Sequence, residues 1–478
     1  MPELPDHPLE LSAGEMRSLV AAALDRIVAH IESLPRQRVS DTSGGDELAR
    51  VLAWEPLPEE GTAVSDLLDL LFDRAVPPSF NTASPGYLAY IPGGGLFHAA
   101  VADLIADSVN RYSSVYAAAP ALAQIEANVI AWFCRLAGYP AEARGTLTSG
   151  GSLANLVALI TARRERLPEN FLSGVIYTSD QAHYSVAKGA ILAGFPEGNV
   201  RSIPTDDQFR LRPDALESRI EEDRRQGLTP FLVTASAGTT NTGAVDPLPE
   251  VADLCERHGL WLHIDAAYGG FFLLTEEGRR AMRGIERADS IVLDPHKGLF
   301  LPYGTGAVLV RDGEALRRAH ELTADYMPHM QSDPERMDFS MYSPELSRPF
   351  RGLRIWLPFR MHGVGVFRAE LEEKLALARM AADRLRGMEG IEILAEPQLS
   401  LLAFRLAPEG VPEERLDELN KRFIERVNVR QRVYLTGTRL RGRFALRICV
   451  VSFRTHRERM EACLEDVEAA RAEVLDRK

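Results

Sequence analysis

The strongest constraint on the fold is a regular alternation of short apolar stretches and amphipathic ones through the middle of the chain. The apolar stretches are rich in β-branched and aromatic residues and predict strands, while the stretches between them have helical periodicity. Strands that alternate with helices predict a mainly parallel sheet covered by helices on both faces. The strands are expected at 175–179, 231–236, 261–265, 290–294 and 306–311, and the helices near 151–166, 184–193, 213–226 and 247–258.

The two ends of the chain differ from this central part, so we expect three regions. Residues 1–80 contain amphipathic helices at about 16–34 and 64–76, and form an N-terminal helical segment that packs on a partner subunit or on the same chain. Residues 81–368 would form a large α/β domain. Residues 369–478, with a long helix followed by strands and helices, would form a small α+β domain.

The composition excludes several classes of protein. A formal net charge of −13 over 478 residues argues against nucleic acid or an anionic membrane as the main partner. No apolar run approaches the roughly 20 residues that span a bilayer, and the N-terminus does not read as a signal peptide. The cysteines are far apart and lack CxxC spacing, which argues against a disulfide framework or a metal site and fits a cytoplasmic protein. They are Cys134, Cys255, Cys449 and Cys463.

The stretch SIVLDPHKG places a lysine at the end of a predicted strand. The strand ends at Asp294 and Pro295, and His296 and Lys297 follow it. In an open α/β sheet the carboxyl ends of the strands are where ligands bind. A lysine at that edge can form a Schiff base with an aldehyde cofactor, although a lone lysine after a strand is more often a solvated surface residue.

Two further motifs predict a phosphate site and an acid at the same edge. Gly151 and Ser152 begin the predicted helix after TSG, and the free N–H groups of a helix start, beside glycines, favour a phosphate. Asp265 ends the strand WLHID, where a buried carboxylate needs a donor such as a protonated ring nitrogen. The small side chain of Ala267 leaves room for a flat ring.

Two more strand ends complete the pattern. His183 follows VIYTS and is suited to stack on an aromatic cofactor, and Thr240 lies in GTTNTG after FLVTAS. Each residue alone has an ordinary structural explanation. Together, a phosphate cradle, an acid, a stacking residue and an aldehyde-accepting lysine are what pyridoxal 5'-phosphate requires.

These motifs resemble those of the group II amino acid decarboxylases that depend on pyridoxal phosphate, the superfamily of aromatic-L-amino-acid and glutamate decarboxylases. The resemblance extends from about residue 12 to residue 455. It is carried by SGGSLANL (149–156), GTTNTGAVDPL (238–248), HIDAAYGG (263–270), DPHKG (294–298) and LSRPFRGLRIW (346–356).

The resemblance implies the fold of aspartate aminotransferase (fold-type I), a homodimer with shared active sites, and decarboxylation of an L-amino acid to an amine. It implies that Lys297 binds the cofactor aldehyde, that Asp265 binds the pyridine nitrogen, and that Lys297, Asp265 and His183 are catalytic. Ala267 would lie under the ring and His183 over it, with Thr240 nearby. The phosphate would be held by Gly151, Ser152 and His296.

The chain departs from the family pattern at two positions. Counting back from RPFRGLR without gaps places Phe339 where the family has the tyrosine that donates a proton to Cα, and members with phenylalanine there can release an aldehyde instead of an amine. Tyr342 and Tyr326 are alternative donors. The family also often has asparagine in place of Asp294, which adds a negative charge near the expected phosphate.

The substrate is left open between aromatic and acidic amino acids, with aromatic slightly favoured. Arg111 would suit an acidic side chain, whereas Tyr87 and Tyr90 would border an aromatic ring. An aminotransferase or carbon–carbon lyase on the same fold would keep the lysine and the aspartate, and a non-catalytic homologue is a further alternative. The long segment before residue 346 and LSRPFRGLRIW favour the decarboxylase.

Overall fold

A computed structural model describes residues 9–321 and 336–476, and its central element is a seven-stranded sheet. The strand order is β1-β7-β6-β5-β4-β2-β3, and all pairings are parallel except those of β7 with β1 and β6. The predicted α/β fold with a mostly parallel sheet is therefore confirmed. The strands are β1 (Arg144–Thr148), β2 (Gly174–Ser179), β3 (Val200–Ile203), β4 (Thr229–Ser236), β5 (Trp261–Asp265), β6 (Ser290–Leu293) and β7 (Gly306–Val310).

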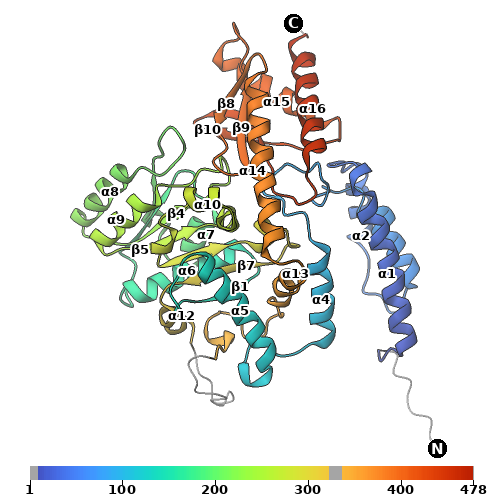
Figure 1. Cartoon of the computed structure of the whole chain (residues 1–478), viewed down its shortest axis with the longest axis horizontal. Helices are drawn as coiled ribbons and strands as arrows, with labels where there is room; N and C mark the ends of the chain where they lie inside the picture. Colours follow the sequence, from blue (N-terminus) through green and yellow to red (C-terminus); the bar gives the residue numbers. More distant parts are fainter. Residues whose placement is uncertain (1–8, 322–335, 477–478) are drawn as a thin grey trace, which may run out of the picture.

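The helices between these strands cover the sheet (Figure 1). The long helix α6 packs across the middle of the sheet, against β1 and β4 to β7, while α8 and α9 pack together elsewhere along β4. Phe133 of α5 and Phe271 after β5 meet edge to face in the core. The helices are α4 (Phe97–Val109), α5 (Pro120–Leu136), α6 (Gly151–Arg166), α7 (Ser185–Leu192), α8 (Pro213–Arg225), α9 (Leu248–His258), α10 (Glu276–Ala281), α11 (Pro295–Gly298), α12 (Gly313–His320) and α13 (Leu353–His362).

A second, four-stranded sheet lies in the C-terminal part, drawn in orange and red in Figure 1. Its order is β10-β11-β9-β8, and every pairing is antiparallel. Its elements are α14 (Val364–Arg386), β8 (Ile391–Ala395), β9 (Leu401–Leu406), α15 (Glu413–Asn428), β10 (Thr436–Leu440), β11 (Arg443–Cys449) and α16 (Arg457–Leu475). Because α14 begins before residue 368 and packs against both parts, the division at 80 and 368 stays a prediction.

The N-terminal helices lie beside the body of the molecule in Figure 1. They are α1 (Ala13–Ser33), α2 (Gly45–Leu52) and α3 (Val64–Asp69), which continues into a π-helical turn (Leu70–Ala75). Helix α1 begins with a capping box between Ser12 and Glu15, yet it buries none of its residues. Its apolar side therefore stays exposed in the single chain. Within the described residues, no helix is both long and apolar enough to cross a membrane.

Candidate active site

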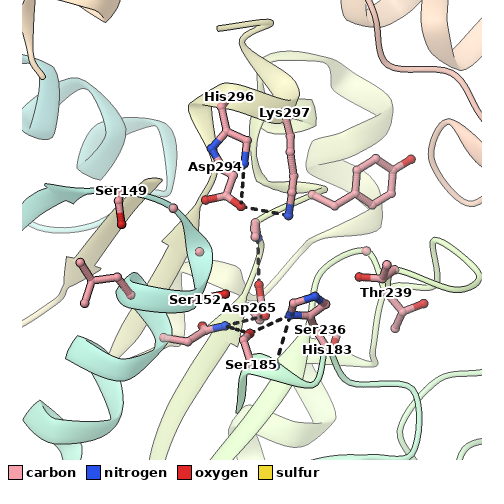
Figure 2. Close-up of a pocket in the computed structure, with 18 residues that line it drawn as sticks. Ser149, Ser152, His183, Ser185, Ser236, Thr239, Asp265, Asp294, His296 and Lys297 are labelled. Carbon is pink, nitrogen blue, oxygen red and sulfur yellow. Dashed lines mark hydrogen bonds and ion pairs between the residues drawn. The ribbon is translucent and has the colours of Figure 1, made fainter. Parts of the chain in front are cut away.

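All eight residues that the sequence assigns to a cofactor site line one cavity of about 270 Å³. The cavity lies at the carboxyl ends of β2, β4, β5 and β6, which are neighbours in the sheet and carry the four predicted strand-end motifs. Figure 2 shows five of these eight residues, Ser152, His183, Asp265, His296 and Lys297, converging from several elements. The eight residues are Gly151, Ser152, His183, Thr240, Asp265, Ala267, His296 and Lys297.

The N-terminus of α6 forms one wall of the cavity. The helix begins at Gly151, and no side chain of the described residues caps it. A Cβ atom at Gly151 would lie 2.9 Å from Asp294 Oδ2 and 3.3 Å from the Cβ of Ala267, so the backbone comes close to the cavity only because this residue is glycine. Uncapped N–H groups and the positive end of the helix dipole favour an anion here.

Lys297 lies on the short helix α11, one turn after β6, and its amine forms an ion pair with Asp294. The distance from Lys297 Nζ to Asp294 Oδ2 is 2.9 Å, and the carboxylate is buried. Burial lowers the pKa of Lys297, but the nearby carboxylates of Asp294 and Asp265 more than offset it, so the pKa is raised overall. Asp294 Oδ1 has no hydrogen-bond partner among the described residues.

His296, next to Lys297, has its ring orientation fixed by the backbone. Its Nδ1–H donates to the carbonyl of Thr305 at 2.5 Å, and its Nε2 lies 3.7 Å from Asp294 Oδ2. Burial lowers the pKa of His296, with Asp294 acting in the opposite direction. The ring therefore faces the cavity with its Nε2 edge.

Asp265 ends β5, and both of its carboxylate oxygens accept hydrogen bonds. Oδ1 accepts from the backbone N–H of Ala267 at 3.1 Å, and Oδ2 accepts from Asn155 Nδ2 at 2.9 Å. The methyl side chain of Ala267 leaves the space above the carboxylate open, and both residues line the cavity.

His183 and Thr240 complete the lining. The Nδ1 atom of His183 lies 2.7 Å from Ser185 Oγ and accepts the backbone N–H of Ser185 at 3.3 Å. Burial lowers the pKa of His183, which favours the neutral ring. The carbonyl of Thr240 accepts a hydrogen bond from Arg447 of the C-terminal sheet, so this sheet holds the Thr240 loop.

The cavity fits a flat aldehyde that carries a phosphate. It combines an uncapped helix start, an amine, and a carboxylate held at the far side, and these are the groups that such a cofactor needs. The small residues Gly151 and Ala267 leave space that larger side chains would fill.

Sequence reasoning missed several residues of the cavity. Asn155 follows Ser152 by one helical turn and so faces the same side of α6, and Ser185 follows His183 by two residues. The spacing of Asn155 from Ser152 was a usable signal. Ser236 and Tyr268 also line the cavity, as do Ser149 and Thr239 from the motifs predicted to face the ligand.

Of the three residues considered for the proton-donor position, Phe339 and Tyr342 do not line this cavity. Phe339 is completely buried, with the Arg348 guanidinium 4.4 Å from the centre of its ring, and Tyr342 is buried in the same core. Phe339 does not line this cavity in the single chain, and its alignment with the proton-donor position stays a prediction. Tyr326 lies outside the described residues.

The residues proposed to contact the substrate also lie apart from the cavity in the single chain. Arg111 is exposed, and Tyr90 is 55% exposed. Tyr87 is buried against Tyr434, with their rings 5.7 Å apart. None of the three lines the cavity formed by the described residues.

Comparison with known proteins agrees with this geometry. Residues 56–407 match the family described as the pyridoxal-dependent decarboxylase conserved domain. The aromatic-L-amino-acid decarboxylase of Bacillus atrophaeus is 36% identical over 468 residues, which cover 98% of this chain and 97% of that protein.

Two solved structures share the fold. The structure of an Oryza sativa TDC with PLP and tryptamine has a TM-score of 0.92 and 29% identity, and covers 98% of this chain and 99% of its own. A Rhodiola rosea 4-hydroxyphenylacetaldehyde synthase has a TM-score of 0.89 at 24% identity, over 97% of this chain and 99% of its own, a likeness of fold alone. The chain belongs to the pyridoxal-dependent decarboxylase family and is a carboxy-lyase with pyridoxal 5'-phosphate as its cofactor.

Proposed function

We propose that the protein decarboxylates an aromatic L-amino acid to the corresponding amine. The observation that carries this proposal is the placement of Lys297 and Asp265 around one cavity beside the uncapped start of α6. The aromatic preference is supported by the aromatic-L-amino-acid decarboxylase that shares 36% of its residues with this chain, and by the tryptamine bound in the similar Oryza sativa structure.

The cofactor supplies an aldehyde that condenses with an amine and a protonated ring that accepts electrons from the bond between Cα and the carboxylate. In our proposal Lys297 presents the amine that first captures the aldehyde. Asp265 keeps a proton at the ring nitrogen, because a carboxylate stabilises a positive charge beside it.

The remaining residues position the cofactor in this proposal. Ala267 lies under the ring and His183 over it, and Thr240 borders the ring. The phosphate is held by Gly151, Ser152 and His296. The uncapped start of α6 supports the phosphate assignment, and the neutral ring of His183 favours stacking.

The test uses the purified holoenzyme with a panel of aromatic and acidic L-amino acids, and measures CO₂, amine, aldehyde, ammonia and peroxide together. We expect CO₂ and amine in equal amounts from at least one aromatic substrate. Aldehyde with ammonia and peroxide would establish the oxidative alternative instead. Stoichiometric decarboxylation of glutamate or aspartate, with aromatic amino acids inert, would contradict the substrate assignment.

We propose that the protein acts as a homodimer in which the N-terminal helices contact the second copy. The exposed apolar residues of α1 support this arrangement, since monomeric proteins rarely expose a large contiguous apolar face. They are Met16, Leu19, Val20, Leu24 and Val28. Sedimentation of the wild type should give a dimer, and Leu24→Glu should weaken it, whereas Glu32→Gln on the same helix should not. A monomeric wild type would contradict the proposal.

We also propose a cytoplasmic location. The four cysteines of the chain are buried and unpaired, which suits a reducing compartment. Fractionation of cells that express the protein should recover it with cytoplasmic markers, and recovery with another compartment would contradict this.

A further inference from the structure

We propose that Asn155, His263 and Ser290 form a hydrogen-bond chain of fixed direction that positions Asp265, and that Asn155 links Asp265 to His183. His263 and Ser290 lie behind the cavity wall, and Asn155 is part of it. We place all three as positioning residues, which act on the cofactor through Asp265 and His183. The inference rests on the proposed role of Asp265 at the ring nitrogen, and the experiments below separate the two.

The donor-to-acceptor direction of this hydrogen-bond chain is set first at Asp265. A carboxylate oxygen only accepts hydrogen bonds, so the group that faces Asp265 Oδ2 at 2.9 Å must be the amide nitrogen of Asn155. The amide oxygen of Asn155 therefore points the other way, toward His263. Asn155 is buried, and an amide turned around would place two acceptors against each other.

The orientation of Asn155 fixes the tautomer of His263. Asn155 Oδ1 lies 2.9 Å from His263 Nε2, and because the amide oxygen accepts, this nitrogen must carry the proton. His263 Nδ1, 2.8 Å from Ser290 Oγ, is then unprotonated and accepts the hydroxyl proton. His263 is almost completely buried, and this burial lowers its pKa, with Asp265 acting in the opposite direction, so the ring stays neutral.

The other end of the chain is closed by a residue that can only donate. Trp261 Nε1–H donates to Ser290 Oγ at 2.9 Å. The Ser290 hydroxyl therefore has its own proton left for His263 Nδ1. Because the indole of Trp261 only donates and the carboxylate of Asp265 only accepts, all hydrogen bonds between them can point the same way. Every polar side-chain atom along this hydrogen-bond chain has a partner.

A branch at Asn155 reaches the opposite side of the cavity. The second N–H of its amide donates to Ser185 Oγ at 2.9 Å. Ser185 Oγ then donates to His183 Nδ1 at 2.7 Å, while the backbone N–H of Ser185 approaches the same nitrogen. His183 consequently carries its proton on Nε2. One amide thus orients both the carboxylate and the imidazole.

The chain matters because Asp265 alone does not determine where its acceptor atoms point. Oδ1 is held by the backbone of Ala267, and Oδ2 by an amide that cannot turn over while His263 donates to its oxygen. Loss of the His263 donor would leave the Asn155 oxygen without this partner and hold the amide less firmly against Asp265. Because hydrogen bonds to charged groups are among the stronger ones in proteins, loss of the one from Asn155 to Asp265 should weaken cofactor binding by about tenfold to a hundredfold.

The first experiment reads the tautomers directly in the cofactor-free protein. The protein is labelled with ¹⁵N-histidine, and the shifts of the two ring nitrogens distinguish protonated from unprotonated nitrogen. His263→Gln and His183→Gln variants identify the two residues among the eleven histidines. We expect both rings neutral with the proton on Nε2 at neutral pH. A proton on Nδ1 of His263 would overturn the direction of the chain.

The second experiment tests whether the position of the donor matters. In His263→Gln the side-chain N–H₂ reaches the place of Nε2, in His263→Asn it reaches only the place of Nδ1, and His263→Leu has no donor. The dissociation constant of pyridoxal phosphate and the pH dependence of the absorbance of bound cofactor are measured for each. We expect His263→Gln to stay near wild type, and the other two to bind at least about tenfold more weakly with a shifted pH profile.

Two controls keep the result interpretable. Circular dichroism and thermal unfolding of each cofactor-free variant report whether it folds, and Asn155→Leu should reproduce the effect of His263→Leu. Wild-type binding and pH profile in His263→Leu, or an equal loss in His263→Gln, would overturn the inference. Asp265→Ala separates the two proposals: wild-type binding and spectrum there would refute the role of Asp265, whereas a loss there with none in Asn155→Leu would refute only the chain.

Discussion

Replacing Asp294 with asparagine should make Lys297 a better nucleophile. The Asp294 carboxylate lies 2.9 Å from the Lys297 amine and is one of the charges that raise the pKa of Lys297 against the effect of burial. Asparagine keeps the shape and removes the charge, so the pKa of Lys297 should fall, with Asp265 left to oppose the effect of burial. An opposite charge at this range typically shifts a pKa by about 1–3 units. At a fixed pH below the pKa, the unprotonated fraction of the amine should rise by about tenfold to a thousandfold.

The assay mixes cofactor-free protein rapidly with pyridoxal phosphate and follows its covalent capture by visible absorbance at a series of pH values. In Asp294→Asn the second-order rate constant should rise at neutral pH, and its pH profile should move to lower pH. Because asparagine also removes a charge near the expected phosphate, the same measurement is made with pyridoxal, which has no phosphate. An effect that disappears with pyridoxal would refute the reasoning about Lys297 and leave only phosphate repulsion.

Three further predictions concern two buried residues of the core and the start of α6. The carboxylate of Glu126 lies 2.6 Å from the guanidinium of Arg348, and both side chains are buried. Glu126→Ala leaves this buried positive charge unpaired and should lower the free energy of unfolding in urea by about 3–5 kcal/mol. An unchanged unfolding midpoint would contradict this. Phe339→Tyr should leave the product ratio unchanged and cost about 1–3 kcal/mol of stability, since the new hydroxyl is buried; an altered ratio of amine to aldehyde would show that residue 339 does occupy the proton-donor position. Gly151→Ala should weaken cofactor binding by about tenfold, measured by fluorescence titration, and wild-type affinity would argue against the close approach at α6.

The sequence was sufficient to predict those site residues that lie at or just after the end of a predicted strand. Asp265 ends β5, and Lys297 follows the end of β6 by one helical turn, so their meeting at one sheet edge follows from the parallel pairing of these two strands. Phe339 shows the limit of this reasoning, since its assignment relied on counting residues back to a short 3-10 helix (Phe339–Met341), and such a count does not predict burial.

Other features depended on contacts that no local pattern reveals. The strands β1 and β3 were not predicted. The segment RGTLT of β1 is short and polar, and β3 is a partly exposed edge strand, so neither has the apolar sequence of the central strands. The apolar run of β7 predicts a strand but not its antiparallel direction. The role of Asn155 depends on which atoms of β5 and α7 face it, which only the folded chain fixes.

The most direct test of the central claim is to find which residue holds the cofactor. Borohydride reduction of the holoenzyme makes the bond between an amine and the cofactor aldehyde permanent, and peptide mass spectrometry then locates the added mass. The chain has only five lysines, Lys188, Lys297, Lys374, Lys421 and Lys478, and they are far enough apart in the sequence for peptides to distinguish them. We predict the cofactor mass on Lys297 alone, and none in Lys297→Ala. Cofactor on another lysine, or no covalent cofactor in the wild type, would contradict the account.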